Sequence, residues 1–158
     1  MKTLLRTMVW LALVVWLGGL LFFGVTAWAS FSTVADTHVA GTIVSKCLNV
    51  LHHEGLIAGI VIVLALGIGY LGKAFRLSTA ALGALVVLLM IACTAWSQYG
   101  IIPRMERDRI AAGGAIDSVP RNDPRHVDFD RLHRVSTHVE EAVMLGGVVL
   151  VILLARDY

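Results

Sequence analysis

Histidines and glutamates gather where the last apolar stretch of the chain begins. Residues 131–145 read RLHRVSTHVEEAVML, so His133 and the pair Glu140-Glu141 lead directly into an uninterrupted apolar run. Imidazole nitrogens bind iron, copper, zinc and nickel, and carboxylates can complete the ligand set of such a metal. Carboxylates at membrane depth are rare and mark binding sites or ion pathways by default. This stretch is therefore the first candidate site.

Helical periodicity decides which of these side chains face the same way. At 100° per residue, one stripe of the helix holds His133, Thr137, Glu140 and Met144. Glu141 flanks this stripe, whereas His138 points to another face. We therefore predict that the stripe faces the interior of a helix bundle.

A second polar cluster opens an earlier apolar run, in the sequence Leu51-His52-His53-Glu54. The helical stripe through His52 is rich in small and polar residues, which favours an inward position for it: Gly41, Ser45, Asn49, Gly59 and Tyr70. His53 lies on a different face of the same helix. The periodicity thus favours His52 as the inward residue.

The composition indicates which kind of element carries these residues. The chain is 58% hydrophobic and 15% charged, whereas soluble domains are about 45–50% apolar and about 25% charged. Only helices satisfy the backbone across a bilayer with so few spans. We predict an all-α integral membrane protein with one domain, 1–158, that is a four-transmembrane-helix bundle with spans at about 8–28, 52–71, 77–101 and 134–155.

Two of these helices are expected to extend beyond the bilayer on one side. Asp36-Thr37 predicts an early start for the second helix, and Asp123-Pro124 predicts an N-cap and first residue for the fourth. Residues 102–123, with a Gly-Gly break, are expected to form a surface loop. The clean apolar part of the fourth span is about 14 residues, or about 21 Å. Because a bilayer core is about 30 Å thick, its glutamates are drawn toward the membrane.

Topology brings the two polar clusters together, since the second and fourth spans begin on the same side. We predict a metal site formed by His53, His133 and Glu140, with a metal ion or haem as the bound group. The wider predicted ligand-binding set is His52, His53, His133, Thr137, Glu140 and Glu141.

Two other interpretations of the polar clusters stay open. Glu140 and Glu141 can form structural salt bridges with Arg131, Arg134 or Lys46, or the cluster can carry protons or ions. No nucleophile–base arrangement is present in the sequence, which favours a non-catalytic role over an enzymatic one. A net charge of +2 without a basic, aromatic-rich run excludes nucleic acid as a partner.

The flanks of the first span predict the orientation. Lys2 and Arg6 precede it, and the positive-inside rule then places both termini in the cytoplasm, in the inner (plasma) membrane of the cell. Ala27-Trp28-Ala29 also resembles a signal-peptide cleavage site, but the preceding apolar core exceeds the usual 7–15 residues. We therefore expect a membrane span there.

Short motifs along the chain resemble a known family. They are Trp16-Leu17-Gly18-Gly19 before Phe22-Phe23, Gly41 and Ser45-Lys46 followed by His53, Pro103-Arg104, and Phe129-x-x-Leu132-His133-x-x-Ser136. In their order, they are similar to the transmembrane protein 205-like family, also called domain of unknown function 4149. The resemblance implies a four-helix integral membrane protein and no established reaction.

A more distant similarity links the Trp-x-Gly-Gly of the first span to copper-resistance-D-like membrane proteins. Some relatives in that wider group bind haem through an intramembrane histidine, which adds weight to a metal or haem site. The family spacing selects His53, in contrast to the helical stripe, which selects His52. The pair Glu140-Glu141 is not part of the family pattern.

The sequence thus leads to two functional hypotheses. The first is a membrane protein with a His/Glu polar site at one membrane face that binds a metal, haem or small ligand. The alternative is a structural or accessory subunit of a larger membrane complex, in which the polar cluster makes packing or partner contacts. The bilayer is a partner in both hypotheses, and other membrane subunits belong to the second.

Overall fold

A computed structural model describes residues 1–157 of the chain, so Tyr158, the end of the predicted domain, lies outside the described residues. The prediction of an all-α fold is confirmed. The elements are α1 (Lys2–Thr33), α2 (Thr37–Leu71), α3 (Leu77–Trp96), the π-helical segment η1 (Ser97–Ile101), α4 (Ile102–Ala111), the 3-10 turn η2 (Ile116–Ser118) and α5 (Pro124–Ala155).

Four helical stretches are long and apolar enough to cross a membrane: Lys2–Thr33, Thr37–Leu71, Leu77–Ser118 and Pro124–Ala155. Their outward faces carry many exposed leucine, isoleucine, valine and phenylalanine side chains, as lipid contact requires. The chain is therefore a multi-pass membrane protein. The predicted fourth span corresponds to α5, because α4 continues the third.

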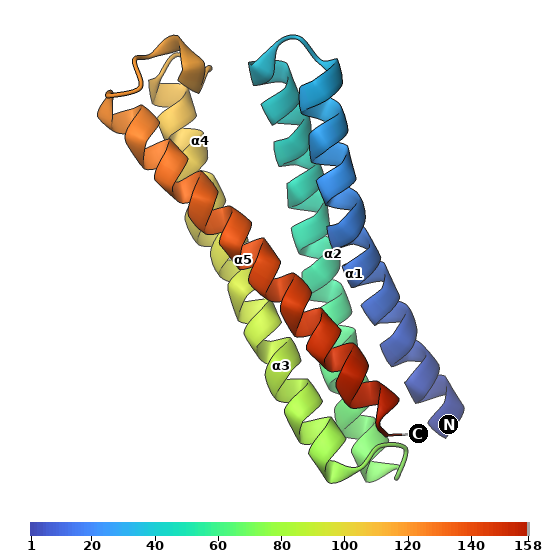
Figure 1. Ribbon diagram of the computed structural model, residues 1–158. Coiled ribbons are helices and arrows are strands. Elements are labelled where there is room, and N and C mark those ends of the chain that lie inside the picture. Colours follow the sequence, from blue (N-terminus) through green and yellow to red (C-terminus); the bar gives the residue numbers. More distant parts are fainter. Residues whose placement is uncertain (158) are drawn as a thin grey trace.

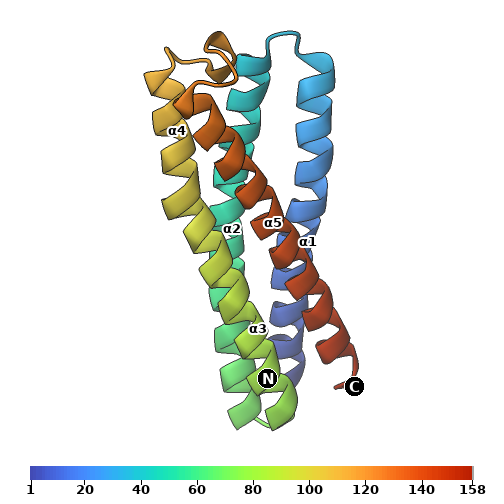
Figure 2. The same cartoon turned by 60° about the vertical axis from the view of Figure 1, so that its left-hand side comes forward.

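The helices form two antiparallel pairs (Figure 1). One pair is α1 with α2, and the other is α5 with the rod formed by α3, η1 and α4. Both chain ends lie at the same end of the bundle in Figures 1 and 2, as an even number of spans requires. The pairs are close together near the termini and separate toward the opposite end (Figure 1).

Aspartates start two of the long helices, as predicted. The Asp36 carboxylate accepts hydrogen bonds from the backbone N–H groups of His38 (2.8 Å) and Val39 (3.2 Å) at the start of α2. Asp123 caps α5 and accepts from the backbone N–H of Arg125 at 2.9 Å. The Arg125 guanidinium also donates to this carboxylate and, with the backbone N–H, lowers the pKa of Asp123 to about 2.

The predicted loop at 102–123 is wrong for its first ten residues, which form α4. Pro103 lies in the first turn of this helix. The chain turns only after Ala111, at Gly113 (φ 85°) and Gly114 (φ 101°). The structure also extends α1 beyond the predicted 8–28. The other three apolar helical stretches likewise are longer than their predicted spans.

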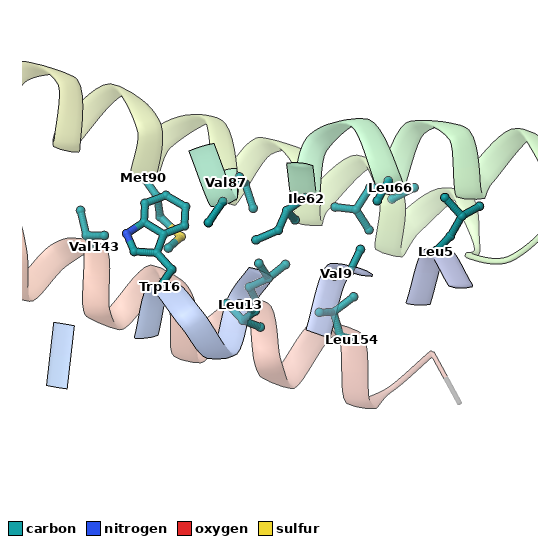
Figure 3. Close-up of a cluster of buried hydrophobic side chains, with 14 of the residues drawn as sticks. Leu5, Val9, Leu13, Trp16, Ile62, Leu66, Val87, Met90, Val143 and Leu154 are labelled. Atoms are coloured by element: carbon teal, nitrogen blue, oxygen red, sulfur yellow. The ribbon is translucent and has the colours of Figure 1, made fainter. Parts of the chain in front are cut away.

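A tryptophan packed against glycines holds the bundle together near its middle. Trp16 is 1% exposed and lies beside Met90, Val87 and Val143 in the core (Figure 3). A Cβ atom at Gly55 would lie 2.4 Å from Trp16 Nε1, and one at Gly59 would lie 3.0 Å from Trp16 Cζ3. The two glycines, spaced as Gly-x-x-x-Gly, therefore allow the indole of α1 to lie directly against the backbone of α2.

A polar cluster fixes the end of the bundle that holds the termini. The Arg6 guanidinium donates to the Ala74 carbonyl at 3.0 and 2.8 Å, which ties α1 to the turn after α2. The buried Asp157 carboxylate accepts from Thr79 Oγ1 at 2.7 Å and lies 3.7 Å from Arg6. These contacts hold the two helix pairs together at this end.

Candidate functional site

A cleft of about 1260 Å³ separates the two helix pairs at the end away from the termini. One wall comes from α1 and α2, between Leu20 and Leu48. The other wall comes from α4, the loop at 115–117 and α5 as far as Leu145. The part of the cleft nearer the termini is therefore at the level of the predicted spans, and the part farther from the termini lies beyond them.

The walls of the cleft are mostly apolar, with polar side chains at defined positions. The apolar side chains include Leu20, Phe23, Val44, Leu48, Ile102, Met105, Phe129 and Met144. The ionisable side chains are His38, Glu106, Arg109, Asp117, Asp130, His133, Glu140 and Glu141. Apolar walls with a few placed polar groups are typical of small-molecule sites.

A buried histidine lies directly behind one of these polar groups. His52 of α2 is 1% exposed, and its Nε2 lies 2.7 Å from Oε1 of Glu140, which lines the cleft from α5. Its Nδ1 lies 2.8 Å from Oε1 of Gln98 in η1. The imidazole thus joins three helical elements, and both of its nitrogens have partners.

A π-helical turn lies at the point of the third helical stretch from which Gln98 contacts His52. The backbone N–H of Ile102 bonds to the carbonyl of Ser97, five residues earlier. Pro103 has no N–H to offer the carbonyl four residues before it, so the regular α-helical pattern cannot continue through this point. Turns of this kind frequently occur at functional sites in helices. Here the turn carries a buried amide into the bundle.

The hydrogen-bond geometry defines where protons can lie. With the Gln98 oxygen toward His52, Nδ1–H donates to it, and one further proton lies between His52 Nε2 and Glu140 Oε1. With the Gln98 amide nitrogen turned inward, a neutral imidazole accepts at Nδ1 and donates to the Glu140 carboxylate. The two arrangements differ by one proton.

The structure brings most of the predicted ligand-binding residues to the cleft. The whole stripe predicted on the last helix lines it: His133, Thr137, Glu140 and Met144. Glu141 also lines the cleft and accepts from His138, whose ring is 3.0 Å away on the outer surface. His133 is exposed, and its ring is stacked on Phe129 with 6.4 Å between ring centroids.

The structure does not assemble the predicted metal set. His53 lies apart from the cleft, in an outer groove lined by α1 and α2. Its Nδ1 bonds the Asn49 carbonyl at 2.8 Å, and its ring meets Tyr99 edge-on. Within residues 1–157, no group of three or more His, Cys, Asp or Glu side chains is placed to hold a metal ion. The step of 100° per residue turns His53 away when His52 faces inward.

The salt bridges expected for the glutamates are also absent from the contacts of the described chain. Glu140 pairs with His52 and Glu141 with His138, whereas Arg131 pairs with Asp128. The partners of both glutamates are therefore imidazoles.

Sequence reasoning missed Gln98. It lies in the stretch Trp96-Ser97-Gln98-Tyr99 at the end of the third span, and the structure buries both Ser97 and Gln98. Ser97 Oγ lies 3.5 Å from Ser136 Oγ of α5, which extends the polar layer. An amide within an apolar helix was the available signal, because such a group needs a buried partner.

The comparison with known families confirms one part of the predicted resemblance, the part to domain of unknown function 4149. The sequence model of one family, described as a domain of unknown function (DUF4149), matches residues 11–110. The chain belongs to this family. The part of this DUF4149 protein that the family model matches runs from α1 into α4. It includes His52 and Gln98, whereas Glu140 lies beyond it. No curated protein and no solved structure matches the chain.

Proposed function

We propose that this DUF4149 protein binds a small amphiphilic molecule in the cleft between its two helix pairs. The apolar walls would hold the apolar part of the ligand, and Glu140, backed by His52, would bind its polar group. The observation that carries this proposal is that a buried imidazole fixes a carboxylate at the wall of a largely apolar cleft.

The depth of the cleft supports an amphiphile over a soluble ligand. Leu20 and Phe23 of α1 and Met144 and Leu145 of α5 line it at the level of the predicted spans. Thr37 and Asp117 line its other end and are joined by a hydrogen bond of 2.8 Å. A ligand with apolar and polar parts matches this change along the cleft.

A bound metal or haem has less support than an organic ligand. Metal ligation needs a free nitrogen lone pair, and both nitrogens of His52 have hydrogen-bond partners. His133 and Glu140 are the two members of the predicted metal set at the cleft. A stoichiometric metal or a haem absorption band in the purified protein would overturn the organic-ligand proposal.

Photolabelling tests the proposal with a neutral probe. The protein in lipid nanodiscs is irradiated with a diazirine-bearing medium-chain alcohol, and the labelled residues are located by peptide mass spectrometry. We expect saturable labelling of cleft residues such as Thr137 and Met144. Labelling spread evenly over the lipid-facing surface would contradict the proposal.

A matched pair of glycine variants makes the test specific. Gly24 lines the cleft, and a Cβ atom there has no neighbour within 4 Å, so Gly24→Leu can place a side chain at the cleft without a clash at its Cβ. Gly67 has the same freedom but lies outside the cleft lining. Gly24→Leu should reduce the saturable labelling, and Gly67→Leu should leave it unchanged. Equal effects would contradict a site in the cleft.

A further inference from the structure

Among the described ionisable side chains that line the cleft, carboxylates outnumber arginines and lysines. Five carboxylates line it: Glu106, Asp117, Asp130, Glu140 and Glu141. Among the described residues that line it, Arg109 is the single arginine or lysine. Its guanidinium is 2.6 Å from Glu106 and also donates to Thr42. One carboxylate is thus balanced by a permanent cation.

The other four carboxylates have imidazole or hydroxyl partners. Glu140 contacts His52, and Glu141 contacts His138. Asp130 lies 3.8 Å from His126, and Asp117 accepts from Thr37. Unlike the Arg109 guanidinium, an imidazole carries a full charge only when it is protonated, so carboxylates outnumber permanent cations among the described residues that line the cleft.

Aromatic side chains add to the attraction for a cation. Phe23, Trp28 and Phe31 line the cleft from α1, and Phe129 lines it from α5. The faces of aromatic rings attract organic cations, and the effect strengthens where water is excluded. The aromatic wall of α1 therefore lies opposite the acidic face of α5 across the cleft.

We propose that the ligand of the cleft is a lipophilic organic cation, such as an amine or quaternary ammonium with an apolar body. This inference rests on the proposed function and specifies the charge of its ligand. The cationic group would lie near Glu140 and Glu141, with the apolar body against α1. An apolar anion would meet the same walls with unfavourable charge.

Two probes of the same shape and opposite charge test the inference. Binding of tetraphenylphosphonium and tetraphenylborate to the protein in nanodiscs is measured by equilibrium dialysis, with empty nanodiscs subtracted. We expect saturable, near-stoichiometric binding of the phosphonium, at least about tenfold tighter than that of the borate. A factor of ten corresponds to about 1.4 kcal/mol.

Charge-removing variants assign the binding to the cleft. Glu140→Gln keeps the size and a hydrogen-bonding group toward His52, and should weaken phosphonium binding about tenfold. Asp130→Asn, at a more exposed position, is a second test if the first variant lowers stability. The control is Glu54→Gln, because Glu54 lines the outer groove and not the cleft. It should leave the phosphonium affinity unchanged.

The outcomes separate this inference from the proposed function. Equal or tighter binding of the borate, or an unchanged affinity in both cleft variants, would overturn the cation assignment. If the neutral alcohol still labels the cleft in that case, the proposed function stands. If neither the alcohol nor the phosphonium binds saturably, both proposals fail.

Discussion

Two neighbouring histidines of α2 have opposite surroundings. His52 is 1% exposed and has hydrogen-bond partners on both nitrogens, whereas His53 lies on the exposed face. A buried polar group without a partner costs about 1–3 kcal/mol. The side chain of His52, and not that of His53, therefore belongs to the polar layer at the base of the cleft.

This difference gives a prediction for stability. His52→Ala leaves Gln98 and Glu140 without their shared partner, so we expect a loss of about 1–3 kcal/mol in unfolding free energy. His53→Ala removes a side chain whose hydrogen bond is to a carbonyl of its own helix, and should change stability by less than about 0.5 kcal/mol. Thermal unfolding in mild detergent compares them. Equal midpoints would contradict the assignment of His52 as the inward residue.

At the scale of elements, small residues and an irregular turn decide how closely the helices approach. Gly55 and Gly59 of α2 receive the Trp16 indole of α1. Across the bundle, a Cβ atom at Gly147 of α5 would lie 2.2 Å from a methyl carbon of Leu17. The turn η1 then lets α3 and α4 continue as one rod beside α5.

The glycine contacts predict a sharp contrast within α2. Gly55→Ala places a methyl group against Trp16, and such overpacking costs about 1–3 kcal/mol. Gly67→Ala has open space and should be neutral or stabilising by up to about 1 kcal/mol. Adding Trp16→Phe to Gly55→Ala removes the indole nitrogen that the methyl group meets. We therefore expect Gly55→Ala to cost less stability in the Trp16→Phe background than in the wild-type chain. A double-mutant cycle of unfolding midpoints measures this difference.

At the scale of the whole molecule, one end of the bundle is closed and the other is open. Arg6, Thr79 and Asp157 join elements at the end that holds the termini. The cleft occupies the other end, so one side of the membrane has access to its polar groups. The orientation of the chain decides which side that is.

Reporter fusions determine the orientation. The positive-inside rule, applied to Lys2 and Arg6, predicts cytoplasmic termini and a cleft that opens to the outer side. Green fluorescent protein fused after the C-terminus should fluoresce, and alkaline phosphatase inserted between Gly113 and Gly114 should be active. The reverse pattern would contradict the orientation. If both reporters lie on the same side, the last helix does not cross the membrane, and the prediction of four spans is wrong.

The sequence by itself determined the helical membrane fold and the inward stripe of the last helix. With so few spans, only long apolar helices satisfy the backbone in hydrocarbon, so their number could be predicted from composition and length. The repeat of 3.6 residues fixed the shared face of His133, Thr137 and Glu140 because it depends on local geometry alone. The same local rule favoured His52, but the family spacing selected His53, so the sequence left the inward histidine open and the structure decided it by burying His52.

Only the tertiary structure decided which groups from different helices meet. Sequence spacing does not give the relative depth of two helices, so it left open whether His52 would meet Glu140 and gave no role to Gln98. The π-helical turn depends on backbone pairing around Pro103, which lies in a stretch that the sequence predicted to be a surface loop. The cleft exists because contacts at one end hold two helix pairs that separate at the other, and that separation is a property of the whole assembly.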